Sequence, residues 1–167
     1  MSKNIALKPL GITVGTLVLV GGAVAAAYGA LRLTGYNLVI GYKNFIPYPL
    51  LVKQVDNGVW LSTAAADAWN AMRAAAYSES VQLTAGSGFR WMSEQMGLWL
   101  KKVAGLYAPA VAKPGTSNHQ QGRAIDVVGL TPGSPAFKWM LVNAGKYGYS
   151  WDEGKSVNEP WHWRYID

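Results

Sequence analysis

Residues 123–130, RAIDVVGL, give the strongest indication of the fold, because a short apolar run that ends in a glycine predicts a buried strand. Downstream, SPAFKWMLVNAGKYG (134–148) predicts a helix with Ser134 as the N-cap and Pro135 in the first turn. Upstream, MSEQMGLWLKKVAGLY (92–107) predicts another helix. The central strand is therefore expected to lie between two helices of the chain.

The same pattern continues away from this centre. STAAADAWNAMRAAAYSES (62–80) predicts an amphipathic helix capped by Ser62 or Thr63, and VQLTAGSGF (81–89) alternates like a short strand. One or two further strands are expected after Tyr147. Helices and strands mix without regular alternation or repeats, so the predicted class is α+β: a small mixed helix and antiparallel-sheet domain over residues 60–167.

Composition excludes several kinds of chemistry. The 167 residues include no cysteine, which removes disulfides, thiolate metal sites and a cysteine nucleophile. The formal net charge is +6, but residues 1–43 hold Lys3, Lys8, Arg32 and Lys43 and no acidic residue, the first being Asp56. Much of the excess charge therefore flanks one apolar segment, and no nucleic-acid partner is expected.

That apolar segment is LGITVGTLVLVGGAVAAAYGAL, residues 10–31, which contains no charged residue. As a helix at ~1.5 Å per residue it would reach roughly 33 Å, enough to span a bilayer. We expect a basic tail at 1–9 and a transmembrane signal-anchor helix at 10–33. A cleaved signal peptide is the alternative, because small residues occur near its end, but the apolar run is longer than usual for a signal peptide.

Two further expectations concern the membrane. The Gly11-x-x-x-Gly15 spacing allows close approach of two helices, which would give a homo-oligomer. Residues 34–59 contain Tyr36, Tyr42 and Phe45 among glycine and proline breakers, and this composition predicts a linker along the membrane interface. Basic residues flank both ends of the apolar segment, so its orientation stays open at this point.

The two histidines of the chain carry the candidate chemistry. His119 precedes Asp126 by seven residues, and His162 follows Glu159 by three. Two imidazoles and one carboxylate form a known zinc ligand set, and a carboxylate next to a ligand is where a general base would lie. Spacing alone does not assign Glu159 as a ligand or a base. A serine-histidine-aspartate arrangement using Ser117 is the alternative, although no nucleophile-elbow glycine pattern surrounds Ser117.

Three ordered motifs carry a family resemblance: SGFR (87–90), KPGTSNHQQGRAID (113–126) and EPWHW (159–163). Together they resemble the VanY-type zinc D-alanyl-D-alanine carboxypeptidases and related phage endolysins, which cleave the stem peptides of peptidoglycan. The resemblance covers roughly residues 60–167 and implies a VanY/hedgehog-like fold. Phe89 and Trp91 depart from residues common in that family, which affects only the expected substrate preference.

The resemblance implies a role for each matching residue. One Zn²⁺ would be bound by His119, Asp126 and His162, with Glu159 as the catalytic base. Arg90 would face the substrate and stabilise its charged group. The remaining expected substrate contacts are Gln95, Ser117 and Trp161, the last because it lies beside His162.

Because peptidoglycan lies outside the cytoplasmic membrane, we expect a single-pass protein with its N-terminus inside and its catalytic domain facing the wall. The preferred function is a phage lytic enzyme that cuts peptidoglycan from a host or virion membrane, since a compact catalytic domain behind a weakly hydrophobic anchor resembles signal-anchor endolysins. One alternative is a bacterial carboxypeptidase that maintains the wall. Another is an inactive structural protein of a membrane or virion on the same scaffold.

Overall fold

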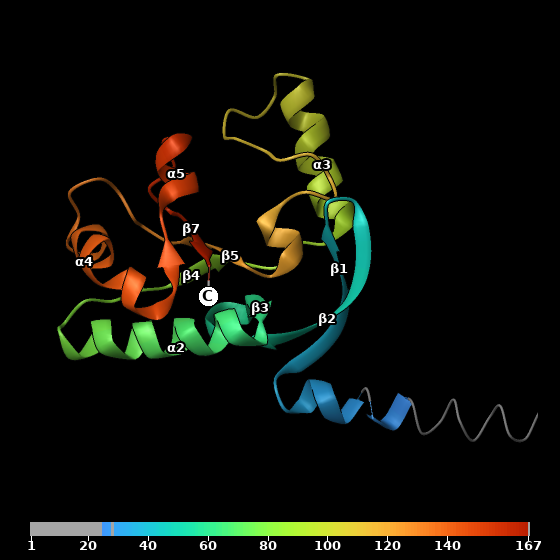
Figure 1. The fold of residues 1–167 in the computed structure, drawn as a ribbon, viewed down its shortest axis with the longest axis horizontal. Coiled ribbons are helices and arrows are strands. Elements are labelled where there is room, and N and C mark those ends of the chain that lie inside the picture. The colour runs from blue at the N-terminus through green and yellow to red at the C-terminus, as the bar shows by residue number, and fades with distance from the viewer. Residues whose placement is uncertain (1–24, 28, 167) are drawn as a thin grey trace, which may run out of the picture. The chain divides into compact units, whose positions relative to one another are not determined.

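Two antiparallel sheets organise the chain (Figure 1). The computed structural model describes residues 25–27 and 29–166. The first sheet has the order β1-β2-β3, with β1 at Tyr36–Lys43, β2 at Ile46–Gln54 and β3 at Trp60–Ser62. The second has the order β4-β5-β7-β6, with β4 at Ala85–Ser87, β5 at Ala124–Val127, β6 at Tyr149–Ser150 and β7 at His162–Tyr165.

Three helices lie around these sheets where the sequence pattern predicts them, and a further short helix lies in the tail after Tyr147, where only strands are expected. The α-helices are α2 (Thr63–Ser78), α3 (Met92–Val103), α4 (Pro135–Asn143) and α5 (Asp152–Ser156). Short 3-10 helices are η1 (Asp56–Gly58), η2 (Asn118–Gln121) and η3 (Ala144–Tyr147). The predicted class, a mixture of helices with antiparallel sheet, is confirmed. The predicted strands at 81–89 and 123–130 are shortened to β4 and β5.

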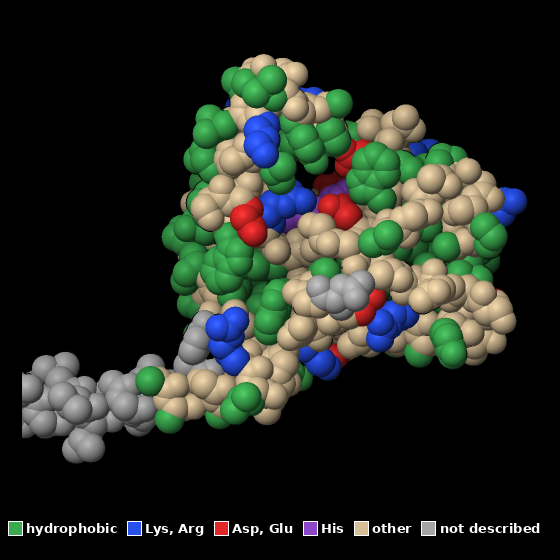
Figure 2. Space-filling view, turned by 180° about the vertical axis from the view of Figure 1, so that it is seen from behind, with side chains coloured by type: hydrophobic (Ala, Val, Ile, Leu, Met, Phe, Trp, Pro, Cys, Tyr) green, Lys and Arg blue, Asp and Glu red, His purple; other side chains and the backbone are tan. Residues whose placement is uncertain are grey.

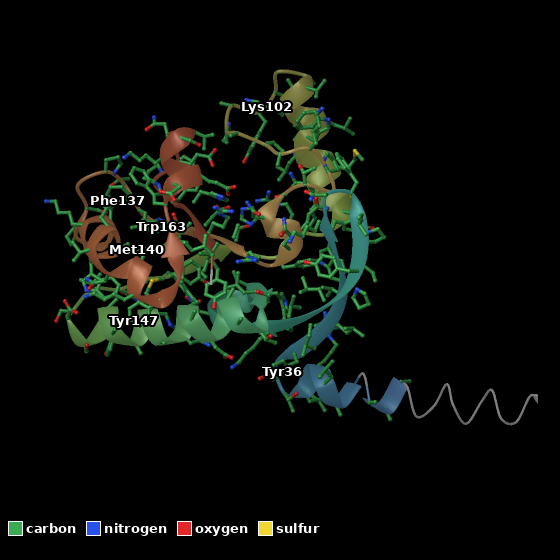
Figure 3. All side chains as sticks on the ribbon, viewed as in Figure 1. Tyr36, Lys102, Phe137, Met140, Tyr147 and Trp163 are labelled. Carbon is green, nitrogen blue, oxygen red and sulfur yellow. The ribbon has the colours of Figure 1, made fainter. Side chains whose placement is uncertain are left out.

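The start of α4 follows from its local sequence. The Ser134 hydroxyl accepts a hydrogen bond from the Phe137 amide at 3.2 Å, and Pro135 occupies the first turn, where a missing N–H costs nothing. This cap directs Phe137 and Met140 into the core, where Figure 3 places them close to Trp163 of β7. In the core, α4 therefore packs against β7, the strand that carries His162.

The other large contribution to the core comes from α2. Its Trp69 and Met72 are fully buried, as is Ile125 of β5, and burying each such side chain stabilises the fold by about 1.5–3 kcal/mol. The Tyr149 hydroxyl donates a hydrogen bond of 2.8 Å to the Ala65 carbonyl. Through Ile125, β5, the strand of Asp126, packs within this core.

The expected linker at 34–59 corresponds to a β-hairpin instead. Residues of β1 and β2 pair in register along their whole length, and Asn44 and Phe45 form the two-residue turn between them. Buried side chains alternate along β1, including Val39, so one face of the hairpin packs on the domain. The compact unit accordingly begins at Gly35 and not near residue 60.

The predicted anchor at 10–33 lies mostly outside the described residues, as does the basic tail at 1–9. Its described part, residues 25–27 and 29–33, is helical. No helix within the described part of the chain has the length and apolar character needed to cross a bilayer.

Candidate metal centre and active-site cleft

His119 is held in one orientation by its backbone and by its ring. The residue lies in η2, where the Ser117 hydroxyl caps the turn by accepting the His119 amide N–H at 3.2 Å. The ring is buried, and its Nδ1 lies 2.6 Å from the Gly88 carbonyl oxygen. Because a carbonyl can only accept, Nδ1 donates its proton to Gly88, which leaves Nε2 as the ring atom that faces Asp126.

The turn after His119 requires a glycine. Gly122 has φ 64°, in the left-handed region, and a side chain there would approach the Ser62 backbone nitrogen to 2.6 Å. This turn leads from η2 directly into β5, so that His119 lies beside Asp126 as the sequence predicts.

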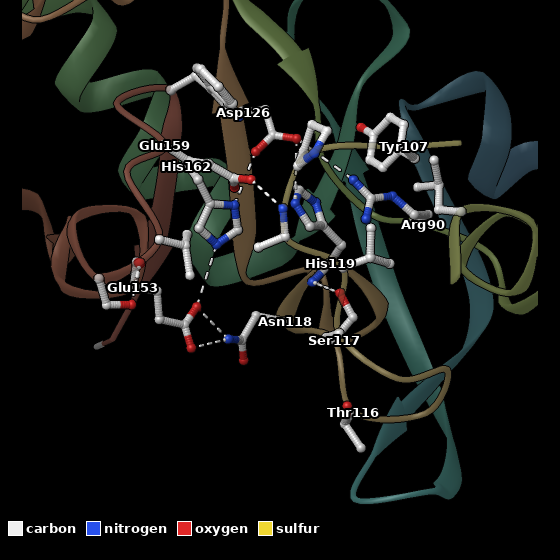
Figure 4. A pocket seen from close by; sticks show the side chains of 18 residues that line it. Arg90, Tyr107, Thr116, Ser117, Asn118, His119, Asp126, Glu153, Glu159 and His162 are labelled. Carbon is white, nitrogen blue, oxygen red and sulfur yellow. Dashed lines mark hydrogen bonds and ion pairs between the residues drawn. The ribbon is translucent and has the colours of Figure 1, made fainter. Parts of the chain in front are cut away.

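Asp126 and His162 are cross-strand neighbours. They pair directly between β5 and β7, and the Oδ1 atom of Asp126 lies 3.0 Å from Nδ1 of His162. The Oδ2 atom of Asp126 lies 3.5 Å from Nε2 of His119. The aspartate is therefore located between the two imidazoles, as Figure 4 shows.

These three side chains have the geometry of a metal site. One ligand atom from each lies within 4.8 Å of the others. Tetrahedral zinc with ligands at ~2.0–2.1 Å separates them by about 3.3 Å, close to the two distances from Asp126. The set of two nitrogens and one carboxylate, with a fixed tautomer at His119, fits Zn²⁺ and leaves a fourth position open.

Without a metal, charge pairing determines the protonation of the cluster. Burial alone would raise the pKa of Asp126, but the adjacent His119 and His162 lower it well below its ordinary value. Burial disfavours protonation of His162, yet hydrogen bonds to Asp126 and Glu153 raise its pKa to about 9. A bound metal ion would take the place of the proton on Nδ1 of His162, so Asp126 has a cationic neighbour and stays ionised in both cases.

Glu159 lines the same cleft from the loop before β7. Its side chain is buried, and its Oε1 atom accepts a hydrogen bond of 2.9 Å from the Ala110 amide. Its backbone is fixed on both sides, since its amide donates to the Gly154 carbonyl and its carbonyl accepts from the Trp151 indole. Figure 4 shows its carboxylate beside Asp126 and His162.

Arg90 lies on the side of Asp126 away from His162, as Figure 4 shows. One guanidinium nitrogen donates to Oε1 of Gln95 at 2.9 Å, and the other lies 3.6 Å from Oδ2 of Asp126. Gln95, expected to contact the substrate, is fully buried and donates its amide to the Ala112 carbonyl at 2.7 Å. Because Gln95 is on the inner face of α3, it supports Arg90 from behind and does not line the cleft.

The other two expected contacts line the cleft, in different ways. Trp161 is partly exposed at the cleft wall. Ser117 also lines it, but its hydroxyl is engaged by the His119 backbone, and among the described residues it makes no hydrogen bond to an imidazole nitrogen. This geometry argues against Ser117 as a nucleophile.

The cleft has a volume of about 430 Å³ and contains all the candidate catalytic groups. Figure 2 shows basic, acidic and histidine side chains gathered in this hollow, with hydrophobic side chains around it. A second hollow of about 780 Å³ adjoins it and shares Arg90, Leu98, Tyr107 and Asp126 with it. Asp126, the central residue of the candidate metal site, therefore lies where two surface hollows meet.

Two further residues belong to the site: Asn118, which lies in the motif around His119 without a predicted role, and Glu153, which none of the three motifs contains. Glu153 of α5 lies 3.4 Å from Nε2 of His162, on the opposite side of the ring from Asp126. Asn118 donates to both carboxylate oxygens of Glu153 at 2.7 Å. The hydrogen bond from His162 is the largest influence that lowers the pKa of Glu153. Glu153 and His162 are separated by a loop, so no regular periodicity links them in the sequence.

Comparison with known proteins places this geometry in a family. The family model described as VanY, D-alanyl-D-alanine carboxypeptidase, matches residues 58–167. A D-alanyl-D-alanine carboxypeptidase of Enterococcus faecalis is 29% identical over 158 residues, covering 77% of this chain and 58% of the relative. The Bacillus subtilis protein YodJ is 32% identical over 150 residues, covering 74% and 55%. The chain thus spans less than three fifths of either relative.

Solved structures agree with the match. The VanY D,D-pentapeptidase of a VanB-type resistance cassette, an E175A mutant in complex with Zn(II), aligns with a TM-score of 0.55 at 26% identity, covering 70% of this chain and 78% of the other. VanYB in complex with D-alanine-D-alanine aligns with a TM-score of 0.57 at 25% identity, covering 72% and 79%.

Proposed function

The chain belongs to the VanY family of D-alanyl-D-alanine carboxypeptidases, and on this basis we propose that it is a zinc-dependent peptidase of peptidoglycan stem peptides. One observation supports the proposal most directly. Two imidazole nitrogens and the Asp126 carboxylate converge within 4.8 Å, with Glu159 in the same cleft. All the groups needed for metal-assisted amide hydrolysis are present, which argues against an inactive scaffold.

His119, Asp126 and His162 would bind the zinc, which when present lowers the pKa of a bound water and polarises an amide carbonyl. Glu159 acts as the general base and then as the general acid. Its Oε1 atom is occupied by the Ala110 amide, so Oε2 is the oxygen available to accept a proton and return it to the leaving amine. The buried backbone around Glu159 keeps this oxygen in place through the reaction.

Arg90 supplies the positive charge of the substrate site. Gln95 holds one side of its guanidinium, and Asp126 lies near the other, so the group is oriented before substrate binds. A guanidinium in this position suits either the terminal carboxylate of a stem peptide or the charge that develops on the carbonyl oxygen.

The proposal has two candidate scissile bonds, a terminal one and an internal one. The D-alanine-D-alanine complex of VanYB favours removal of a terminal D-alanine. The second hollow beyond Arg90 favours a longer substrate, because it adjoins the cleft and adds about 780 Å³ of space beside Arg90. A cut within a stem or cross-bridge would make the enzyme lytic, as expected for a phage protein, whereas terminal trimming suits bacterial wall maintenance.

The proposed substrate also bears on location. Because peptidoglycan lies outside the cytoplasmic membrane, we propose that residues 10–33 anchor the protein with its N-terminus inside and its catalytic unit on the wall side. A virion membrane would serve the same purpose for a phage enzyme.

Mass spectrometry of full-length protein with purified peptidoglycan and a soluble stem pentapeptide tests both candidates. Zinc-dependent loss of one terminal D-alanine identifies a carboxypeptidase, and release of cross-linked or whole stems identifies an endopeptidase. Chelator and a Glu159→Gln variant are the matched controls. Absence of any zinc-dependent product would refute the proposed peptidase.

A further inference from the structure

The outer face of the β1–β2 hairpin is apolar and exposed. Three apolar cross-strand pairs share this face: Leu38 with Leu51, Ile40 with Pro49, and Tyr42 with Pro47. The pair of Tyr36 and Lys53 follows at its end, where Lys53 forms an ion pair with Asp67 of α2 at 2.6 Å. The exposed fractions are 50% for Leu38, 49% for Ile40 and 38% for Leu51. An antiparallel sheet with one face in water normally presents polar side chains there, so this face lacks the composition of a solvated surface.

The opposite face of the hairpin explains why the ribbon is rigid. Val39 and Val52 are buried against the unit, and Gly41 lies so close to Gln120 that a side chain at position 41 would approach its carbonyl oxygen to 3.1 Å. At the tip, the Phe45 amide donates to the Gly115 carbonyl at 2.8 Å. The hairpin is thus attached to the loop that leads into His119, and it forms an edge of the unit (Figure 1).

The preceding chain indicates what covers the apolar face. Residues 10–31 carry no charge, and Leu38 follows Leu31 by seven residues, a reach of at most ~24 Å even when fully extended. No acidic residue occurs before Asp56, whereas Arg32 precedes the hairpin and Lys43 lies at its tip, at the end of β1, a charge pattern that suits anionic lipid headgroups. Tyr36 and Tyr42 are residues typical of the headgroup region.

We propose that the outer face of the β1–β2 hairpin lies on the lipid bilayer, in the headgroup region. The contact would fix the orientation of the unit, because the hairpin and the η2 segment carrying His119 are packed together. The cleft would then act at a set height above the membrane. This inference goes beyond the peptidase activity, and it rests on the proposed anchor at residues 10–33.

Site-specific fluorescence in vesicles tests the contact. Since the chain has no cysteine, single substitutions can each carry an environment-sensitive fluorophore: Ile40→Cys on the hairpin face, Val20→Cys in the proposed anchor, and Leu141→Cys on α4 as the control with a matching exposure of 52%. The full chain is reconstituted into vesicles of phosphatidylcholine with a minority of phosphatidylglycerol. Nitroxide-labelled lipids then report proximity to the bilayer.

We expect lipid nitroxides to quench the labels at positions 20 and 40 severalfold more than the label at 141. Quenching at position 20 alone would overturn the hairpin contact while leaving the anchor intact, and quenching at neither position would overturn both. A blue-shifted but unquenched label at position 40 would show that protein covers the face. Dependence of that shift on protein concentration would distinguish a second copy from the chain's own apolar segment.

A substitution of the face provides a second measurement. In a Leu38→Thr, Leu51→Thr variant, both residues keep a high β-propensity but lose apolar surface. We expect lower quenching at position 40, unchanged quenching at position 20, and unchanged hydrolysis of the soluble pentapeptide. Unchanged quenching at position 40 would contradict the proposal, and loss of pentapeptide hydrolysis alone would bear on the peptidase and not on the membrane contact.

Discussion

Glu153 lies 3.4 Å from Nε2 of His162, while Asp126 lies 3.0 Å from Nδ1 of the same ring. Both ring nitrogens of His162 therefore have a carboxylate partner, and Nδ1 points toward Asp126 and the candidate metal site. A metal-ligating histidine commonly donates its second N–H to a carboxylate, which fixes the ring and its tautomer. Glu153 is itself held by Asn118 and lies 3.9 Å from the Arg164 guanidinium.

Removing this carboxylate should weaken zinc binding. We expect Glu153→Leu to lower zinc affinity by about 10–100-fold, because His162 loses the partner that orients it. Glu153→Gln should retain most of the affinity, since an amide oxygen still accepts the Nε2 proton. Competition titration with a chromophoric chelator measures both variants, and Asp152→Asn, an exposed neighbour, is the control. Wild-type affinity in Glu153→Leu would show that Glu153 does not position His162.

A substitution of Glu159 should reduce catalysis without removing the metal. In Glu159→Gln we expect the rate of hydrolysis to fall by about 10²–10⁴-fold, the usual contribution of a general base, while zinc content stays near one ion. His119→Ala should lose the metal itself. Zinc content by atomic emission, together with the pentapeptide assay, tests both. Metal loss in Glu159→Gln with unchanged hydrolysis would overturn the assignment.

Gly154 packs against the backbone of both His162 and Glu159. A Cβ at this position would clash with the His162 carbonyl oxygen and approach that of Glu159 to 2.5 Å. We expect Gly154→Ala to destabilise the protein by about 1–3 kcal/mol and to reduce activity, because the backbone of either residue must move. Urea denaturation measures the change in free energy of unfolding. Gly145→Ala, where no atom lies within 4 Å of the added carbon, should leave stability nearly unchanged.

Most of the residues that meet in the cleft are predictable from the sequence because their signals are local. Ser134 and Pro135 mark the start of α4, and the motif around His119 and Asp126 needs only a glycine turn to bring the two side chains together. The sequence predicts a linker in place of the hairpin because Pro47 and Pro49 resemble strand breakers. They are tolerated because β3 pairs only with residues 52–54 of β2, so the proline-containing part of β2 has one open edge.

The roles of Gln95 and Glu153 could not be predicted for a different reason. Both depend on tertiary contacts: Gln95 on the direction in which α3 presents it, and Glu153 on how α5 packs next to β7. A motif indicates that a polar residue is near the site, but it does not tell whether the side chain faces the substrate or supports another residue from behind.

The metal-free protein should lose stability as the pH rises from about 6.5 to about 9. The pKa of His162 is raised from 6.5 to about 9 in the folded state, so the folded protein binds a proton more tightly than the unfolded chain. The resulting stabilisation is complete below the unfolded pKa and disappears as pH passes through the folded value. Its size is on the order of a few kcal/mol at ~1.4 kcal/mol for each pKa unit.

Denaturation of chelator-treated protein across this pH range measures the effect. His162→Asn cannot titrate and should show a much flatter dependence over the same interval, because the remaining shifted carboxylates, Asp126 and Glu153, have lowered pKa values and titrate only under acidic conditions. An equal loss of stability in the wild type and in His162→Asn would show that another group is responsible and that the ring is not held between the two carboxylates.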